Sequence, residues 1–155
     1  MTATTGTDAL ITTEMVDLNL QATSKDDATR HLARLLVAQG RITDLDGFLA
    51  DVRAREAQMA TGLEGGIGIP HCRSEHVRVP TLGFGKSEAG VDYGAADGPA
   101  HLIFLIAAPA GADSDHMKIL AALARRLVRA QFKDTLRAAT DPAAVADYIR
   151  TEVTP

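Results

Sequence analysis

The sequence has little of what several protein classes need. Its 155 residues include one cysteine, Cys72, so the chain cannot form an intramolecular disulfide. It also lacks a basic block, because 16 Lys and Arg against 20 Asp and Glu are spread along the chain, with a formal net charge of −4. Nucleic-acid-binding domains carry a basic patch or stripe. We therefore expect no nucleic-acid partner.

Long apolar segments are missing as well. The longest run, residues 102–108, is far shorter than the roughly 20 residues that span a bilayer. Residues 1–8 lack the charged start and apolar stretch of a secretory signal. These two observations predict a cytoplasmic protein without direct membrane insertion.

The overall composition is that of an ordinary globular domain. With 46% hydrophobic and 23% charged residues, the chain has none of the compositional bias of disordered proteins. Its length suits one unit with a sizeable core. We expect a flexible leader over residues 1–10 and one domain over residues 11–155.

Periodicity predicts the elements of this domain. Alternation over residues 16–20 indicates a strand, and helical spacing predicts helices over 24–40 and 45–58. Two more strands are predicted over residues 80–85 and 101–108, the second so apolar that it should be central and covered on both faces. Turns are expected over 90–94 and 96–99, and helices over 114–129, 132–139 and from Asp141-Pro142 onward. This order predicts the α/β class and a single three-layer α/β/α sandwich.

His71 is the first candidate for chemistry. It ends the approach from Thr61, in which Gly65, Gly66 and Gly68 permit bending and Pro70 stiffens the chain. A neutral histidine keeps a lone pair on one nitrogen and a proton on the other, which suits a nucleophile or a base. Glycine N–H groups can also approach an anion closely, so we expect the glycines to line an anion cradle. In the alternative reading, His71 ends a strand and the glycines serve turns.

Arg55 and His116 are the second and third candidates. Helical spacing places Arg55 on the face of Phe48, Val52 and Met59, where it either pairs with Glu56 at the helix end or points at an anion held by His71. His116 lies in the first turn of a helix, and helix N-termini bind anions. As an alternative, His116 is a core or capping histidine. The carboxylates of residues 113 and 115 would repel an anion there unless they point away.

Other chemistries find no support in the sequence. His71, Cys72 and His76 do not complete a zinc-ligand set, so neither a metal nor a cofactor is expected. His31 is expected to be a surface or core histidine. The chain lacks the G-x-S-x-G elbow of the serine hydrolases and the Walker sequence of P-loop proteins.

Several ordered motifs together resemble the enzyme IIA domain of the fructose/mannitol class (type 2) of the bacterial phosphoenolpyruvate-dependent sugar phosphotransferase system. The resemblance covers residues from about 10 to 150. The matching motifs are Arg55-Glu56, Thr61-Gly62, Gly66-Ile-Gly-Ile-Pro-His71, the segment 97–109, and Asp115-His116 followed by Leu120 and Leu123.

The resemblance implies a mixed sheet between helical layers and the activity of a histidine phosphotransferase. His71 matches the catalytic histidine, which accepts a phosphoryl group from the phosphocarrier protein HPr and passes it to a cysteine of a fructose-type IIB component. Through IIB, the chain would serve the IIC membrane permease. Arg55 and His116 match the residues that stabilise the phosphoryl group. Cys72 is then only a neighbour of His71, since the family's cysteine acceptor lies in another domain.

Two alternatives remain. A nitrogen-type regulatory relative would share the fold and the histidine but signal through its phosphorylation state. Residues 97–100 and 107–111 resemble the fructose type more closely. The other alternative is a non-catalytic binder of an anion or a metal. The transported sugar stays unnamed, because sugar contacts belong to the membrane domain.

Overall fold

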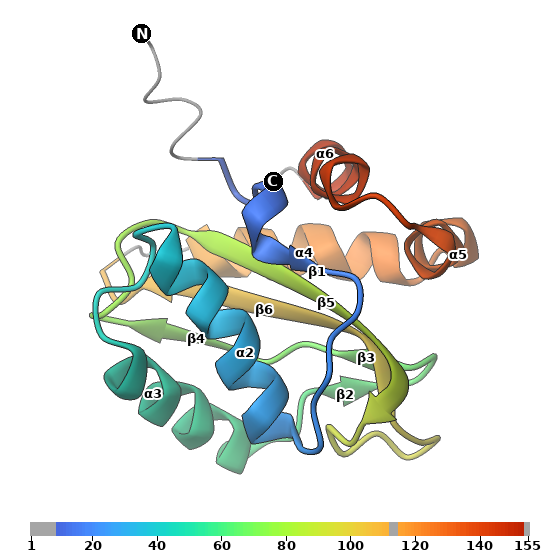
Figure 1. Cartoon of the computed structure of the whole chain (residues 1–155). Helices are drawn as coiled ribbons and strands as arrows, with labels where there is room; N and C mark the ends of the chain where they lie inside the picture. The colour runs from blue at the N-terminus through green and yellow to red at the C-terminus, as the bar shows by residue number, and fades with distance from the viewer. Residues whose placement is uncertain (1–8, 112–114, 154–155) are drawn as a thin grey trace, which may run out of the picture.

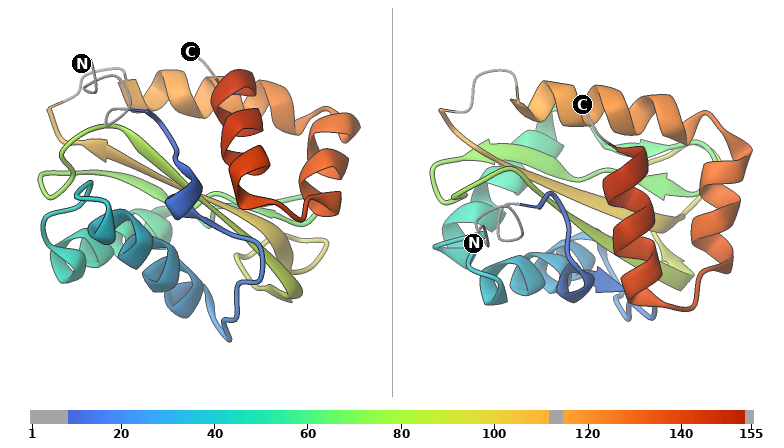
Figure 2. Two further views of the ribbon diagram at one scale, coloured as in Figure 1. Left: turned by 45° about the horizontal axis from the view of Figure 1, so that its top comes forward. Right: turned by 90° about the horizontal axis from the view of Figure 1, so that it is seen from above.

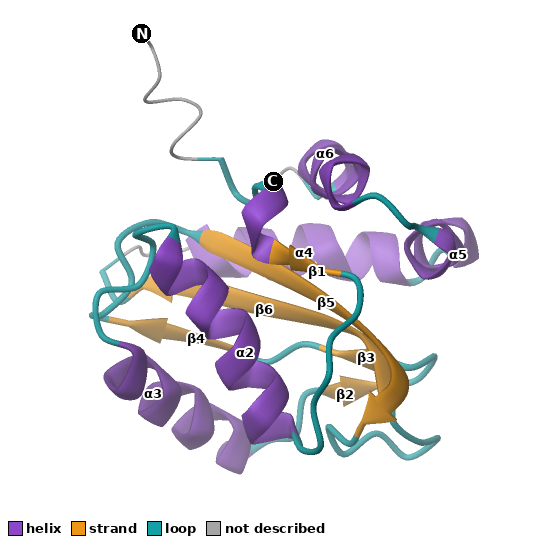
Figure 3. Cartoon of the chain, in the orientation of Figure 1, coloured by secondary structure: helices purple, strands orange, loops and turns teal. Residues whose placement is uncertain are grey.

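A computed structural model describes residues 9–111 and 115–153, except for the side chains of residues 115 and 116. Figure 1 shows the chain, and Figure 3 distinguishes its helices from its strands. The elements in chain order are η1 (Thr13–Met15), β1 (Val16–Asp17), α2 (Lys25–Ala38), α3 (Leu45–Gln58), β2 (Gly62–Leu63), β3 (Ile67–Gly68), β4 (His71–Ser74), β5 (Thr81–Val91), β6 (Ala100–Pro109), α4 (Asp115–Leu127), α5 (Ala130–Ala138) and α6 (Pro142–Glu152).

The six strands form one mixed sheet, in which five strands have the order β1-β5-β6-β3-β2 and β4 pairs with β6. β5 runs antiparallel to β6, whereas β3 and β4 both run parallel to β6 and pair with successive parts of the same edge. In this register Ile67 lies opposite Leu102, and His71 lies opposite Ile106. The chain therefore leaves the edge of β6 after β3 and rejoins the same edge at His71, where β4 begins.

Helices cover both faces of the sheet, as the views in Figures 1 and 2 show. α2 and α3 lie on one face, where α2 contacts β5 and α3 contacts β4. α4 contacts β6 from the other face, and α6 packs against η1 and β1. The expected three-layer α/β/α sandwich is confirmed, and so is the mixed sheet that the family resemblance implied.

The core is centred on β6. Every side chain from Leu102 to Ala108 is fully buried, which confirms the prediction of a central strand covered on both faces. Phe104 contacts Phe84 of β5 with ring centroids 5.0 Å apart and faces Phe132 of α5 at 6.4 Å. Aromatic contacts therefore join the two long strands to the C-terminal helices.

Three helices, α2, α3 and α6, begin where a side chain satisfies one of their first free N–H groups. Ser24 Oγ accepts from the N–H of Asp27 at 3.1 Å at the start of α2. Asp44 does the same for Gly47 at the start of α3. In α6, Pro142 occupies the first turn and Asp141 accepts from the N–H of Ala143.

The strands differ from the prediction in three ways. The expected strand over residues 16–20 is only Val16–Asp17, because the Asp17 carboxylate accepts from the N–H of Asn19 and turns the chain. β5 runs on to Val91 through part of an expected turn, with an irregular register after Lys86. β2, β3 and β4 were not predicted, because two to four residues are too few to show a period.

At the N-terminus, residues 1–8 of the expected leader lie outside the described part of the chain. Leu10 packs against the core, and its carbonyl accepts from the N–H of Leu82 at 2.8 Å. Residue 114, the expected first residue of the helix predicted over 114–129, also lies outside the described residues. Among the helices that the structure describes, none has both the length and the apolar character to cross a bilayer.

The end of α5 depends on Lys86. Its ammonium donates to the carbonyls of Arg137 and Ala139, which have no partner within the helix. We expect Lys86→Met to lower the free energy of unfolding by about 1.5–3 kcal/mol, the usual contribution of hydrogen bonds from a charged group. Urea unfolding measures this change. Lys118→Met, at an exposed position of α4, is the control, and equal losses in both variants would contradict the capping role.

Candidate functional site

His71 stands at the first position of β4, where the chain rejoins the edge of β6. The carbonyl of Pro70 accepts from the N–H of Ile106 at 3.0 Å, which anchors the backbone just before the histidine. Because side chains alternate along a strand, His71 and Arg73 point to one side of β4 and Cys72 to the other. His71 is half-buried, and Cys72 is buried.

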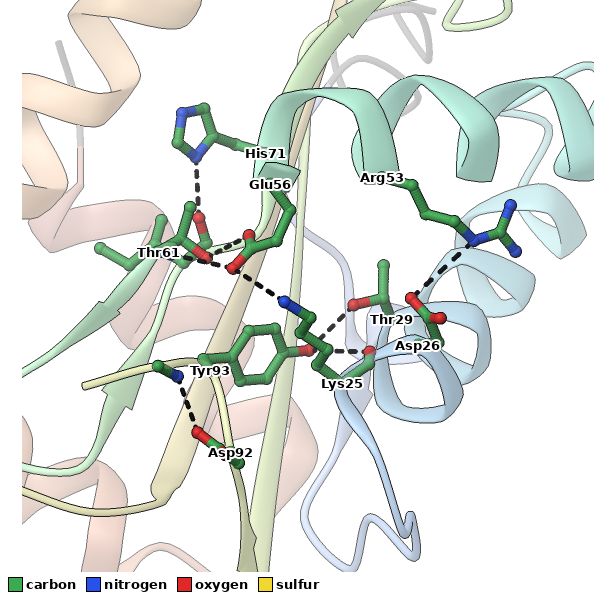
Figure 4. A network of polar contacts seen from close by, with 11 residues as sticks. Lys25, Asp26, Thr29, Arg53, Glu56, Thr61, His71, Asp92 and Tyr93 are labelled. Carbon is green, nitrogen blue, oxygen red and sulfur yellow. Dashed lines mark hydrogen bonds and ion pairs between the residues drawn. The ribbon is translucent and has the colours of Figure 1, made fainter. Parts of the chain in front are cut away.

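One hydrogen bond fixes the His71 ring. Its Nδ1 lies 2.7 Å from the carbonyl oxygen of Ile69 (Figure 4). A carbonyl oxygen only accepts, so Nδ1 must carry the proton, and in neutral His71 the lone pair lies on Nε2. The backbone thus assigns the tautomer, and Nε2 is the nitrogen able to act as a nucleophile.

Beside His71 lies a hollow of about 390 Å³ between α3 and β4. Its described lining comprises Asp51, Ala54, Arg55 and Gln58 from the helix and His71, Cys72 and Arg73 from the strand. The structure therefore brings Arg55 and His71 together at one site. A guanidinium is always charged, and its planar fork matches the geometry of a phosphate.

Asp51 is the acidic residue of this lining. Its Oδ2 accepts from Ser74 Oγ at 2.6 Å, and Ser74 Oγ accepts in turn from the N–H of His76 at 3.1 Å. This hydrogen bond ties the middle of α3 to the end of β4. It also engages one oxygen of the carboxylate with a neutral donor of the protein.

The sequence model of the family described as "Phosphoenolpyruvate-dependent sugar phosphotransferase system, EIIA 2" matches residues 9–152, which include the whole site. The chain belongs to this family. Phosphotransfer is the activity of EIIA domains of this system, and the site presents a histidine suited to it.

Two curated relatives are fructose-specific. The PTS system fructose-specific EIIA component of Haloferax volcanii is 36% identical over 137 residues, covering 88% of this chain and 89% of the relative. The fructose-specific EIIABC component of Bacillus subtilis is 35% identical over 141 residues. Those residues are 90% of this EIIA chain but only 22% of that longer protein.

Solved structures agree in fold. The nitrogen regulatory protein IIA-Ntr of Neisseria meningitidis superposes with a TM-score of 0.80 at 25% identity, covering 94% of this chain and 97% of the other. The complex of enzyme IIAMTL with phosphorylated enzyme IIBMTL from Escherichia coli gives a TM-score of 0.72 at 21% identity, covering 89% of this chain and 95% of that one. Fructose-type and nitrogen-type proteins are thus both similar to this EIIA chain.

His116 lies in the first turn of α4, but its side chain is outside the described part of the structure. Its role next to a phosphoryl group therefore stays a prediction. The same applies to the expected conflict with the carboxylates of residues 113 and 115.

In the neutral alternative, Arg55 pairs with Glu56. The structure gives the Glu56 carboxylate other partners. That carboxylate is buried and accepts two hydrogen bonds from Thr61, with Lys25 as its ion-pair partner at 3.8 Å. Met59 was expected on the inward face of α3 but is 67% exposed. It follows the last residue of the helix, so helical spacing no longer describes its direction.

The expected anion cradle is wrong. Gly65 and Gly66 have φ values of +92° and +79° and form the turn between β2 and β3, where a side chain would be strained. The N–H of Gly65 already donates to Asp97. A Cβ on Gly68 would lie 2.7 Å from the Tyr93 ring. Turn geometry and close packing therefore explain these glycines.

The other described histidines have structural partners. His31 Nε2 lies 2.7 Å from the Asp17 carboxylate, His101 Nδ1 donates to the Ser87 carbonyl, and His76 lies near Asp44. Among the described residues, no group of three or more His, Cys, Asp or Glu is arranged to hold a metal ion.

Arg73 and Asp51 line the hollow but were not among the residues predicted from the sequence. Arg73 had a readable signal, since it follows His71 by two positions and strand alternation puts both on one side. That signal required knowing that residues 71–74 are a strand. Asp51 follows from the helix, because it precedes Arg55 by four residues and so shares its face.

Cys72 cannot act as a thiolate near neutral pH. Burial raises the pKa of its thiol to about 12, and the negative charge of Asp51 adds to the shift. A thiol must lose its proton to become a nucleophile. The side chain therefore serves the core of the EIIA domain.

We expect iodoacetamide to alkylate folded Cys72 at pH 8 far more slowly than the same chain unfolded in urea. The chain has one cysteine, so the mass of the intact protein reports this residue alone. The unfolded chain provides the internal control. Equal rates in the folded and unfolded states would show that the thiol is accessible and readily ionised.

Proposed function

We propose that this EIIA chain accepts a phosphoryl group from phospho-HPr on Nε2 of His71 and passes it to the cysteine of a fructose-type IIB component. The observation that carries this proposal is the hydrogen bond between His71 Nδ1 and the Ile69 carbonyl. It leaves the lone pair on Nε2 of His71, a residue that lines the same hollow as Arg55.

The two transfers conserve charge and atoms. In the first, the Nε2 lone pair attacks phosphorus, the phosphorus–nitrogen bond of phospho-HPr breaks, and the HPr histidine recovers its lone pair. Phosphorylated His71 then keeps the Nδ1 proton, and the Ile69 carbonyl stabilises the positive charge shared by the ring. In the second, a IIB thiolate attacks phosphorus, and Nε2 recovers its lone pair.

The protein's contribution is to position the histidine and to stabilise charge, since phosphoryl transfer leaves little covalent work to the enzyme. Arg55 would hold the phosphoryl oxygens with its guanidinium. Arg73, on the side of β4 that His71 occupies, adds a second cation to the lining. His116 stands at the N-terminus of α4 as the proposed third group.

The fructose-type recipient is supported by the identity to the two fructose-specific relatives. The solved complex of enzyme IIAMTL with phosphorylated enzyme IIBMTL, a protein of the same fold, supports IIB as the class of partner. Through IIB, the chain would serve the IIC membrane permease. Sugar transport is the resulting role.

A nitrogen-type regulatory role is the second candidate, because IIA-Ntr has a TM-score of 0.80 with this chain. Transfer from the phosphorylated chain to a fructose IIB domain separates the two. Fast discharge to the IIB cysteine supports transport. A stable phosphoprotein that IIB does not discharge supports regulation.

We expect His71→Ala to abolish phosphoryl uptake without unfolding the chain, because it removes the nucleophile but no core side chain. The measurement is the intact mass after incubation with HPr and its phosphoryl donor, together with the circular dichroism spectrum. His31→Gln, at a histidine of α2 bound to Asp17, is the matched control and should be phosphorylated normally. A phosphorylated His71→Ala protein would refute the assignment.

Replacing Arg55 by Gln should slow uptake by roughly tenfold to a thousandfold, the effect of removing one group that stabilises transition-state charge. The rate is measured at saturating phospho-HPr. Arg53→Gln is the control on the same helix, since Arg53 lies near the Asp26 carboxylate at 3.8 Å instead of lining the hollow. Equal rates for the two variants would return Arg55 to a purely structural role.

A further inference from the structure

Glu56 occupies an unfavourable position for a carboxylate. It lies in the last turn of α3, near the negative end of the helix dipole, and it is only 9% exposed. Burying a charge is costly unless it is paired and hydrogen-bonded. A residue that breaks both local preferences needs a compensating role in the structure.

Both oxygens of this carboxylate are engaged (Figure 4). Oε1 accepts from the Thr61 hydroxyl at 2.7 Å, and Oε2 accepts from the Thr61 N–H at 3.0 Å. The ammonium of Lys25, from α2, lies 3.8 Å from Oε2. Thr61 is itself buried, with 8% of its surface exposed. Glu56 therefore binds Thr61 through two hydrogen bonds.

Thr61 leads to the His71 ring through two further hydrogen bonds. Its carbonyl accepts from the N–H of Ile69 at 3.1 Å, and the carbonyl of Ile69 accepts from His71 Nδ1 at 2.7 Å. Thr61 and Ile69 flank the β2–β3 hairpin, so this contact closes the hairpin at its base. Glu56, Thr61, Ile69 and His71 form a continuous series, which we call the Glu56 chain.

We propose that Glu56 is a positioning residue for His71: through the Glu56 chain it fixes the Ile69 carbonyl, and this carbonyl selects the Nδ1–H tautomer that exposes Nε2. The inference rests on the proposed phosphoryl transfer for its purpose. Its geometric part, the control of the tautomer, stands on the hydrogen bonds alone.

A second group of contacts supports the same segment from the other side. The N–H of Gly62 donates to the Tyr93 carbonyl at 2.9 Å. The Tyr93 hydroxyl pairs with Thr29 at 2.9 Å and donates to the Lys25 carbonyl at 3.3 Å. α2 thus supports Gly62, the neighbour of Thr61, through Tyr93, and it also supplies Lys25, the cation beside Glu56. The base of the hairpin remains tethered when Glu56 is changed, so the variants should fold.

Two variants test the Glu56 chain. Glu56→Gln keeps the shape but removes the charge: its amide oxygen can accept from the Thr61 N–H, and its NH₂ can only donate to the Thr61 hydroxyl, so two charge-assisted hydrogen bonds become weaker neutral ones. Thr61→Val removes only the hydroxyl bond, and Thr61→Ser restores that bond as the conservative rescue. Glu64→Gln is the matched control, because it makes the same chemical change at an exposed position of the same hairpin.

The first readout is the tautomer of His71, measured by long-range ¹H–¹⁵N correlation on ¹⁵N-histidine-labelled, unphosphorylated protein. Wild type, Thr61→Ser and Glu64→Gln should show the Nδ1–H form. Glu56→Gln and Thr61→Val should show a mixture with Nε2–H. The second readout is the rate at saturating phospho-HPr. It should fall by about tenfold to a hundredfold in the same two variants, as expected for a misplaced reacting group.

The proposal is overturned if Glu56→Gln and Thr61→Val match Glu64→Gln in tautomer and rate and only unfold at lower temperature. An Nε2–H tautomer in the wild type would overturn it too. If the tautomer shifts as expected but phospho-HPr does not label even the wild type, the positioning role stands and the proposed phosphoryl transfer fails. Should Glu56→Gln fail to fold, Thr61→Val tests the chain through the hydroxyl alone.

Discussion

The pairing of β3 and β4 with successive parts of one edge of β6 is the constraint on which the site depends. β6 is apolar and fully buried from Leu102 to Ala108, so its position in the sheet is fixed. A strand that leaves this edge after Gly68 and returns at His71 must place Ile69 and Pro70 in a short step between them. That step aims the Ile69 carbonyl at the histidine ring. The sheet therefore brings the Ile69 carbonyl to the ring, and the proposed Glu56 chain keeps it there.

The site itself forms where this edge meets α3. The strand supplies His71 and Arg73, and the helix supplies Arg55 and Asp51. The two elements are joined by the hydrogen bond from Ser74 to Asp51. Both arginines lie on regular elements packed against the core, so in the proposed phosphoryl transfer these two cations of the lining would be held in place beforehand. Such preorganisation is the main contribution a protein makes to phosphoryl transfer.

The fold and the site were predictable to different degrees. The helix from Leu45 to Gln58 and the strand after Ala100 have long, clear patterns, and both were predicted closely. The short strands around Gly62 to Ser74 exist because β6 offers them an edge, and two-residue strands carry no period of their own. The prediction of an anion cradle failed because Gly65 and Gly66 belong to the turn between β2 and β3, two strands that the sequence pattern does not show. His71 was found from its motif, but its tautomer depends on a hydrogen bond that no spacing reveals.

The central claim is that the phosphoryl group resides on Nε2 of His71. The most direct measurement is ¹H–¹⁵N NMR of the wild-type protein, labelled with ¹⁵N-histidine and phosphorylated by phospho-HPr. Coupling to phosphorus at Nε2 of His71, with the proton still on Nδ1, is the predicted result. Phosphorus coupled to Nδ1, or to another histidine, would contradict the account, because His71 Nδ1 donates a hydrogen bond to the Ile69 carbonyl in this structure.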